Sequence, residues 1–197
     1  MEALARHPEV AVLLERFETE PRHVVHVAGL ADQLALTGLM LAGQDPSDFR
    51  LLQVAALLHD IGWAVVAPDG KGHHKESARL IREFQWTSLD PLEIELVALT
   101  ARYHRKALPS VEHADYARLN PDDQRRVRRM AALLRVADAL DRRHIQRVDR
   151  VSVLGMTDEL QIRVYGTDEV EAELAAAEKK GDLLRLESPV PMHFIVG

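Results

Sequence analysis

The segment of residues 51–62, L-L-Q-V-A-A-L-L-H-D-I-G, constrains the fold more than any other part of the chain. Seven apolar residues that favour helices lead directly into His59 and Asp60, which predicts a buried helix with two polar residues at its end. A buried carboxylate is too costly to leave isolated, so this pair must be hydrogen-bonded, paired with a charge or bound to a metal ion. Metal coordination would satisfy both side chains at once.

Composition limits the class of protein. The 197 residues are 47 % hydrophobic and 28 % charged, which is ordinary for one folded domain with a small appendage. The absence of cysteine excludes disulfides, thiolate zinc sites and cysteine nucleophiles. The N-terminus does not resemble a signal peptide and no apolar run reaches membrane-spanning length, so we expect a cytoplasmic protein without a membrane partner. The formal net charge of −6 argues against a dedicated nucleic-acid binder.

Residues 1–147 have the periodicity of a helical domain. A break at residues 43–46 precedes the helix that contains residues 51–62, and Asn120-Pro121-Asp122-Asp123 is a helix-start signal. Residues 107–119 should be irregular or form a short helix. We expect further helices at residues 8–17, 22–39, 73–84, 92–106 and 120–144.

From residue 148 the pattern changes to that of a small α+β appendage, which we expect to span residues 148–197. Residues 151–154 and 160–165 alternate as strands do, around a turn at 155–159. Residues 168–180 predict an amphipathic helix that Gly181 ends, and the final His-Phe-Ile-Val segment predicts a third strand. The fold class is therefore mainly α: a helical bundle with a small C-terminal α+β tail in the order strand, strand, helix, strand.

Polar residues recur at helical positions that face the predicted core. Asp138 is the strongest candidate for a functional residue among them. It lies in the mostly apolar A-A-L-L-R-V-A-D-A-L stretch, where Asp is an unfavourable helix residue. A lone buried His-Asp doublet is most often a structural hydrogen-bonded pair. The additional residues favour a metal site, and imidazole and carboxylate ligands suit zinc, iron, manganese or cobalt. The set comprises His23, His59, Asp60, His73, His104 and Asp138.

The order His, His-Asp, Asp resembles that of the HD superfamily of metal-dependent phosphohydrolases, which are all-helical. The motifs L-L-H-D-I-G, G-H-H-K-E-S-A-R-L-I, A-R-Y-H-R-K and L-L-R-V-A-D-A-L-D-R-R-H resemble the C-terminal domain of the exopolyphosphatase and guanosine pentaphosphate phosphohydrolase family. The match spans about residues 20–150. These residues include no counterpart of that family's N-terminal actin-like domain, to which the polyphosphate chemistry is assigned. The resemblance therefore implies the fold more directly than exopolyphosphatase activity.

Carried over by position, the resemblance implies a divalent ion held by His23, His59, Asp60 and Asp138, with His23 selected over His26. The ion would be manganese, iron, cobalt, zinc, nickel or magnesium. His73 and His104 would hold a second ion, bind phosphate directly or move protons, and His74 is a close competitor of His73. We expect His74 and Asp60 to act in catalysis. Basic residues beside the motifs are candidates for phosphate contacts: Lys75, Arg105, Lys106, Arg142 and Arg143.

Several other polar and aromatic residues have simpler interpretations. Trp63 could stack on a base, although a wall of the core is the simpler role. Asp141 could support a metal ligand or pair with an arginine. The basic run Arg125, Arg126, Arg128 and Arg129 indicates a solvated helix face rather than a nucleotide or RNA patch. The histidines outside the motifs are most simply surface residues: His7, His113 and His193.

Two functions are consistent with these residues. The first is a metal-dependent phosphohydrolase that acts on a phosphorylated small molecule, such as a nucleotide or alarmone, through a metal-activated water. The second is a non-catalytic binding or regulatory module that recognises guanosine phosphates or polyphosphate. The sequence is compatible with a homodimer but does not require one.

Overall fold

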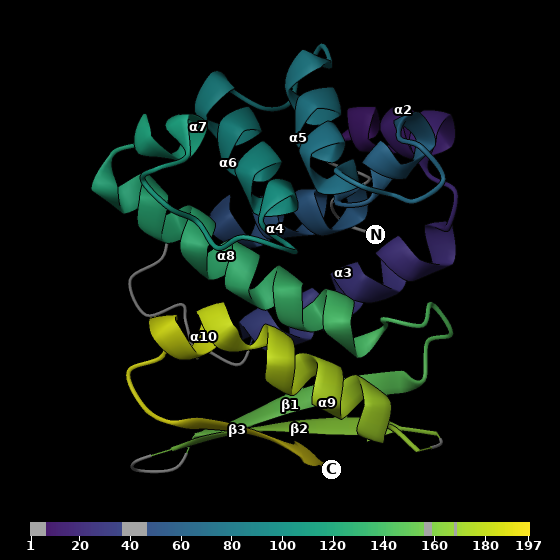
Figure 1. Cartoon of the computed structure of the whole chain (residues 1–197), viewed down its shortest axis with the longest axis vertical. Coiled ribbons are helices and arrows are strands. Elements are labelled where there is room, and N and C mark those ends of the chain that lie inside the picture. The colour runs from purple at the N-terminus through teal and green to yellow at the C-terminus, as the bar shows by residue number, and fades with distance from the viewer. Residues whose placement is uncertain (1–6, 37–46, 156–158, 168) are drawn as a thin grey trace.

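The computed structural model describes residues 7–36, 47–155, 159–167 and 169–197, and its helices form one layered bundle (Figure 1). None of the helices in these residues is long and apolar enough to cross a membrane. The helices of the N-terminal part are α2 (Pro8–Phe17), α3 (Pro21–Leu36), α4 (Ser47–Leu58), a 3₁₀ helix (Ile61–Val65), α5 (His73–Glu83), α6 (Pro91–Arg102), α7 (Ala114–Ala117) and α8 (Pro121–Leu140).

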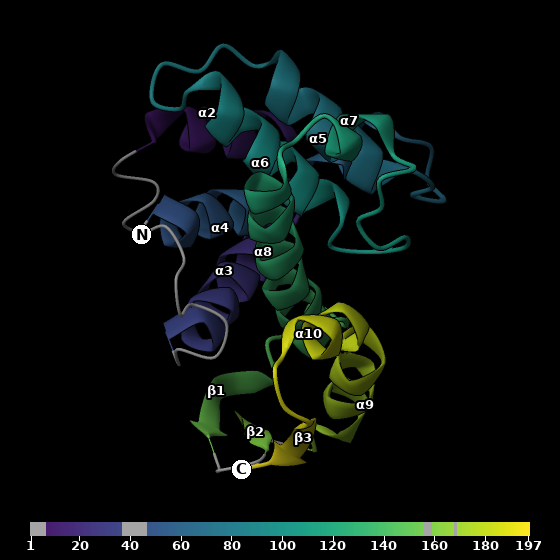
Figure 2. The same ribbon diagram turned by 90° about the vertical axis from the view of Figure 1, so that its left-hand side faces the viewer.

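Residues 148–197 form a three-stranded sheet with two helices, which confirms the predicted α+β tail. The elements are β1 (Val148–Gly155), β2 (Leu160–Gly166), α9 (Glu171–Lys180), α10 (Asp182–Glu187) and β3 (Met192–Val196). β1 and β2 are antiparallel neighbours, and β3 lies parallel to β2 on its other side. A parallel pair needs a crossover connection, and α9 and α10 supply it. Both helices lie between the sheet and α8 (Figures 1 and 2).

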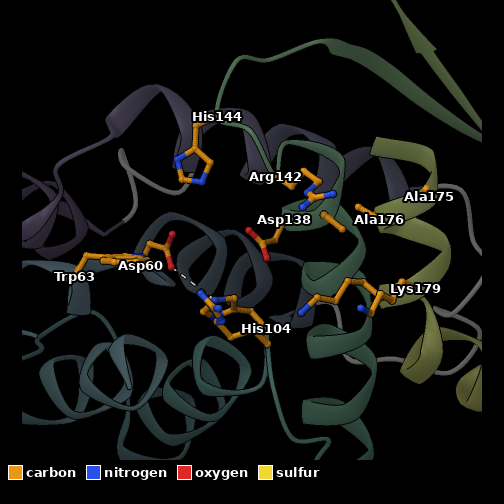
Figure 3. Close-up of a pocket in the computed structure, with 12 residues that line it drawn as sticks. Asp60, Trp63, His104, Asp138, Arg142, His144, Ala175, Ala176 and Lys179 are labelled. Atoms are coloured by element: carbon orange, nitrogen blue, oxygen red, sulfur yellow. Dashed lines mark ion pairs between the residues drawn. The ribbon is translucent and has the colours of Figure 1, made fainter. Parts of the chain in front are cut away.

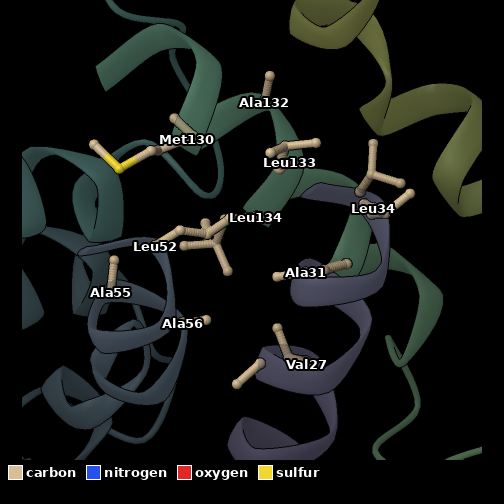
Figure 4. Close-up of a cluster of buried hydrophobic side chains, with 14 of the residues drawn as sticks. Val27, Ala31, Leu34, Leu52, Ala55, Ala56, Met130, Ala132, Leu133 and Leu134 are labelled. Atoms are coloured by element: carbon tan, nitrogen blue, oxygen red, sulfur yellow. The ribbon is translucent and has the colours of Figure 1, made fainter. Parts of the chain in front are cut away.

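One hydrophobic core runs from the bundle into the tail. Around α3, α4 and α8 it alternates small residues, such as Ala31 and Ala56, with large ones, such as Leu34, Leu52 and Leu134 (Figure 4). Alanines at these positions let the helix backbones approach closely, while the leucines fill the space between them. This close packing brings the polar ends of several helices to one place.

Helix starts follow the predicted capping signals. The Asn120 side chain accepts hydrogen bonds from the backbone N–H groups of Asp122 and Asp123, so the predicted start of α8 is confirmed. The start of α6 is a capping box, in which Asp90 and Glu93 each accept from the other's backbone N–H. The predicted short helix in residues 107–119 is α7.

Helix ends differ from the prediction at three places. α6 ends at Arg102 rather than near residue 106, and Lys106 has a left-handed φ of 62°, which an α-helix does not contain. α8 ends at Leu140 rather than near residue 144, where His144 has a φ of 55°. α4 ends at Leu58, so His59 and Asp60 lie in the turn before the 3₁₀ helix. Side-chain periodicity does not reveal these backbone turns.

The tail also differs in detail. α9 begins at Glu171, later than the predicted residue 168, and a helix that was not predicted, α10, follows Gly181 directly. Gly181 has a φ of −72°, so it does not adopt the left-handed conformation that usually ends a helix. The predicted break at 43–46, residues 37–39 of the predicted 22–39 helix, residues 156–158 of the predicted turn and residue 168 lie outside the described residues.

Candidate metal centre

Five elements bring the predicted ligands to one place. His23 lies in the first turns of α3, and His59 and Asp60 follow α4. His73 begins α5, and His104 follows α6. Asp138 lies in the last turn of α8. Each residue is therefore at or near a helix end, where its helix packs against the others, and the sequence-based expectation of a cluster is met by the geometry.

Asp60 occupies the middle of the cluster, with one carboxylate oxygen facing each of two histidine pairs. Its Oδ2 atom lies 3.9 Å from Nε2 of His23 and 3.6 Å from Nε2 of His59. Its Oδ1 atom lies 3.2 Å from Nε2 of His73 and 3.6 Å from Nε2 of His104. This arrangement would let Asp60 contribute to two neighbouring metal positions.

Asp138 closes the first of these two positions. Its Oδ1 atom is 3.6 Å from Nε2 of His23 and 3.8 Å from Nε2 of His59. The side chain of Asp138 is 21 % exposed, whereas the two histidines are buried. The position thus has buried imidazoles on one side and a partly open carboxylate on the other.

The hydrogen bonds of the histidine rings fix which nitrogen faces the centre. Nδ1 of His59 donates to the carbonyl of Ala56, and Nδ1 of His104 donates to the carbonyl of Ala101. A carbonyl oxygen can only accept, so in the neutral rings the electron pair is on Nε2, which points at the carboxylates. His73 makes the same bond to the carbonyl of Gly70. Such a hydrogen bond from the ring nitrogen that does not bind the metal is what orients a metal-binding imidazole.

Buried atoms without partners show that the residues fit a cation. Nε2 of His23, Nε2 of His59 and Oδ1 of Asp60 are buried and make no hydrogen bond within the described residues. Unpaired buried polar atoms are costly, and a divalent ion accepts electron pairs from imidazole and carboxylate alike. Three groups have ligand atoms within 4.8 Å of one another: His23, His59 and Asp138; His23, Asp60 and His144; and His59, Asp60 and His104.

The charges of the cluster also call for a cation. Burial raises the pKa of Asp60, but the nearby imidazoles of His59, His73 and His104 more than offset this and hold it well below its usual range. Burial lowers the pKa of His23, but Asp138 and Asp141 outweigh burial and raise it to about 10. Burial lowers the pKa of His104 to about 3, so its ring is neutral. The carboxylates thus stay ionised and demand positive charge, from protons or from a metal ion.

A comparison with protein families agrees with this geometry. A family model described as Ppx/GppA phosphatase, domain III, matches residues 5–180. The chain belongs to the Ppx/GppA phosphatase family. This confirms the resemblance drawn from the four motifs. The comparison with curated proteins found no match.

A pocket of about 510 Å³ opens over the centre of this Ppx/GppA domain (Figure 3). Asp60, Trp63 and His104 line one side of it, α8 contributes Asp138 and Ala139, and the turn after α8 contributes Arg142. The α9 side contributes Ala175, Ala176, Lys179 and Lys180, and Arg105 and His144 complete the lining. This volume suits a small-molecule ligand. Two predicted phosphate contacts, Arg105 and Arg142, therefore lie in the same pocket as the predicted metal ligands.

The other predicted basic residues lie elsewhere. His74, Lys75 and Lys106 line a neighbouring pocket of about 380 Å³ that shares Arg105 with the first. Burial and the nearby His73 lower the pKa of His74 to about 4, so its ring is neutral. The catalytic role of His74 and the phosphate role of Lys75 stay predictions. Arg143 instead binds Glu173 on α9 through two hydrogen bonds of 2.7 Å.

The part played by His73 is affected by Arg105. The Arg105 guanidinium donates to Nε2 of His73 at 3.1 Å, so the electron pair that a second metal ion would need is occupied. The Trp63 ring stacks on the His73 ring, with the two ring centroids 4.4 Å apart. The tryptophan is 38 % exposed and lines the pocket, so it is not a wall of the core, and its contact with a base stays a prediction.

Other sequence interpretations are decided by single contacts. Asp141 accepts from Nδ1 of His23, so it supports a ligand rather than pairing with an arginine. The exposed Arg125 pairs with Asp122, as a solvated helix face would, but Arg126 binds the buried Asp48 of α4 and Arg128 binds Glu187 of α10, so the expectation of a solvated face is wrong for these two arginines. The expectation that His7 is a surface residue is wrong: it is 3 % exposed. Its ring bonds to Ser88 and Arg50, because α2 packs over the turn that precedes α6.

Sequence reasoning did not find His144. Its ring stacks on His23 with centroids 3.6 Å apart and planes 4° apart, and its Nδ1 donates to Glu20 at 2.6 Å. Because an imidazole binds a metal ion within its own plane, two parallel stacked rings cannot hold the same ion in this arrangement. His144 therefore covers His23 at the pocket and is not a ligand beside it. The position of His144 depends on the left-handed backbone conformation after α8, which no sequence motif indicates.

Proposed function

We propose that this Ppx/GppA-family chain is a metal-dependent phosphohydrolase that acts on a phosphorylated small molecule, such as a nucleotide or alarmone. One observation carries the proposal. A cluster of buried imidazole nitrogens and carboxylates with unpaired electron pairs opens into a pocket that also contains Arg105 and Arg142. Within the described residues, neither arginine pairs with a carboxylate, so both are available to phosphate oxygens.

The metal position would be formed by His23, His59, Asp60 and Asp138. A divalent ion bound there would polarise a phosphoryl oxygen and lower the pKa of a bound water from ~15.7 towards ~7. The chain's contribution is to fix these ligands in advance. Backbone carbonyls and Asp141 orient the rings, and the close packing of α3, α4 and α8 holds their spacing.

The remaining pocket residues would bind and orient the substrate. Arg105 and Arg142 present planar guanidinium groups, which match two phosphate oxygens at once. Arg105 is itself oriented by its bond to Nε2 of His73. The neutral ring of His104 adds no charge that would compete with these arginines for the phosphate. Trp63 covers one side of the site and limits the access of solvent.

The non-catalytic alternative is supported by that same Arg105–His73 bond. With Nε2 of His73 occupied by a guanidinium, the second ligand set is incomplete and the pocket resembles a site for holding phosphate. A module of this kind would bind guanosine phosphates or polyphosphate without hydrolysing them. Its ligand binding would survive removal of the metal ion.

The test is elemental analysis of protein purified without chelator, followed by a screen of nucleotides and other phosphoesters for phosphate release with manganese, cobalt or iron. We expect metal to co-purify and at least one substrate class to be turned over. The variants His59→Ala and Asp138→Ala should lose both metal and turnover. Stoichiometric metal without turnover of any phosphoester would contradict the hydrolase and favour the binding module.

A further inference from the structure

The helix α9 of the C-terminal tail forms one wall of the pocket over the metal centre. Four of the pocket residues belong to it: Ala175, Ala176, Lys179 and Lys180. Figure 3 shows Lys179 on the α9 side, with Asp138 between it and Asp60 and Trp63. Because Ala175 and Ala176 are small, the wall leaves room for a ligand between the helix and the centre. The tail is thus part of the pocket.

Ion pairs with α8 and with the turn that follows it hold α9 in place at both ends. Near its start, the Glu173 side chain is 1 % exposed and receives two hydrogen bonds of 2.7 Å from Arg143. Just past its end, Asp182 accepts bonds of 3.0 to 3.2 Å from Arg135, which is itself buried. Paired guanidinium–carboxylate contacts are geometrically specific. The backbone at the end of α9, which carries Lys179 and Lys180, therefore has a defined position beside the site.

The two lysines have no acidic partner. Within the described residues, neither Lys179 nor Lys180 makes an ion pair, although ion pairs are frequent elsewhere in the chain. Burial, together with the nearby Arg135 and Arg105, lowers the pKa of Lys180, and the more distant charges of Asp138 and Asp182 only partly oppose this. The pocket thus gathers four cations that are not balanced by a contacting carboxylate: Arg105, Arg142, Lys179 and Lys180.

One phosphoryl group does not use all of these cations. Arg105 and Arg142 lie in the turns that follow α6 and α8, close to His104 and Asp138, and two forked guanidinium groups satisfy the oxygens of one phosphate. The lysines belong to a different wall, and the pocket volume of about 510 Å³ exceeds what one phosphate needs. Positive charge without a local partner, in a chain of net charge −6, indicates a second anionic group on the ligand.

We propose that Lys179 and Lys180 bind a second anionic group of the substrate, so that the tail helix selects ligands with two anionic groups over simple phosphate monoesters. This inference rests on the proposed function for the phosphoryl group at the metal centre. The lysines act on specificity: they bind the part of the substrate that does not react. The tail would then define which phosphorylated molecules enter, while the helical bundle supplies the metal centre.

The experiment measures the binding of two probes, inorganic phosphate and pyrophosphate, to the full chain loaded with manganese, by calorimetry. We expect the wild type to bind pyrophosphate about tenfold more tightly than phosphate, and Lys179→Gln with Lys180→Gln to remove most of that difference, as the loss of a charged hydrogen bond would. Phosphate affinity and metal content should stay within about twofold. The exposed Lys71, which pairs with Asp69, offers the matched control Lys71→Gln.

Three outcomes decide the matter. Recovery of the preference in the charge-retaining Lys179→Arg/Lys180→Arg variant supports direct binding by the two cations. Equal weakening of both probes in the glutamine variant overturns the inference, because the lysines would then act only through the general field of the pocket. A wild type that hydrolyses phosphoesters, with a glutamine variant that still prefers pyrophosphate, overturns the inference and leaves the proposed function standing. Preserved helical circular dichroism shows that each variant is folded.

Discussion

Asp141 accepts a hydrogen bond of 2.9 Å from Nδ1 of His23, across 118 positions of the sequence. The bond decides which nitrogen of His23 faces the metal centre. The same carboxylate accepts from the backbone N–H of Gln146 at 2.7 Å and from its side-chain amide at 3.0 Å. Asp141, which directly follows α8, therefore positions both His23 on α3 and the loop that carries His144. The candidate metal centre and the start of the tail are structurally connected through Asp141.

We expect Asp141→Asn to weaken metal binding by about tenfold, the lower end of what the loss of a carboxylate behind a ligating histidine causes. The amide keeps the shape of the side chain but removes the charge that favours a donating Nδ1. Titration with cobalt, followed by its absorption spectrum, would measure the change. Gln146→Ala is the control, because it removes the loop contact and leaves the bond to His23. Equal metal affinity in Asp141→Asn and wild type would contradict the orienting role.

Removal of metal should lower thermal stability. A ligand present at about 100 times its dissociation constant stabilises a folded protein by about 2.7 kcal/mol, which is roughly 5–10 °C in the midpoint for a chain of this size. We therefore expect manganese to raise the melting temperature of chelator-treated wild type by that amount. His59→Ala should not respond, because it loses a ligand at the centre. The exposed His193 provides the control His193→Ala, which should respond as the wild type does.

Gly62→Ala should unfold or strongly destabilise the protein. A Cβ at residue 62 would overlap the carbonyl oxygen of His73 and lie 2.5 Å from the backbone nitrogen of Ser77, so α5 would have to move. Overpacking of this kind typically costs about 1–3 kcal/mol and occasionally more, and the rigid backbone of α5 places this site at the upper end. Urea unfolding would measure the loss.

Gly29→Ala is the opposite case in the same experiment. A Cβ at residue 29, within α3, would meet nothing within 4 Å. Alanine is a better helix former than glycine by about 0.8–1.0 kcal/mol, so we expect a small gain in the free energy of unfolding. A Gly62→Ala variant as stable as Gly29→Ala would show that α5 does not pack tightly against the His-Asp turn.

Glu9 should contribute stability that is lost in acid. Burial raises its pKa, but hydrogen bonds from Thr87 and Ser88 outweigh burial and lower the pKa from an ordinary 4.5 to about 2. A lowered folded-state pKa means that the contribution is fully present above about pH 4.5 and disappears as the pH falls towards 2. We expect Glu9→Gln to cost about 2 kcal/mol at pH 7.

The pH dependence separates this effect from simple loss of packing. The difference in urea-unfolding free energy between wild type and Glu9→Gln should shrink as the pH falls from 5 to 3, because the unfolded chain, with an ordinary Glu pKa of 4.5, takes up a proton there while the folded carboxylate stays ionised. A difference that stays constant over this range would mean that the charge of Glu9 does not matter.

Much of the bundle and of the metal centre could be predicted from the sequence. Helical periodicity shows which side of a helix is buried, and a polar residue on that side, such as His23 or Asp138, is conspicuous because it is costly there. The His59-Asp60 doublet is conspicuous for the same reason, after seven apolar residues. The sequence thus determined the fold class, the family motifs and which residues could bind metal.

Only the tertiary structure decided how these residues are oriented and what surrounds them. Asp141 meets His23, His144 covers the ring of His23, and α9 brings Lys179 to the pocket, although each contact joins distant parts of the chain. Such contacts depend on where helices end and on how they pack, which are set by backbone turns and by long-range packing rather than by local periodicity. For that reason the sequence indicated which residues could bind a metal ion, whereas only the structure showed which residues surround them in the pocket.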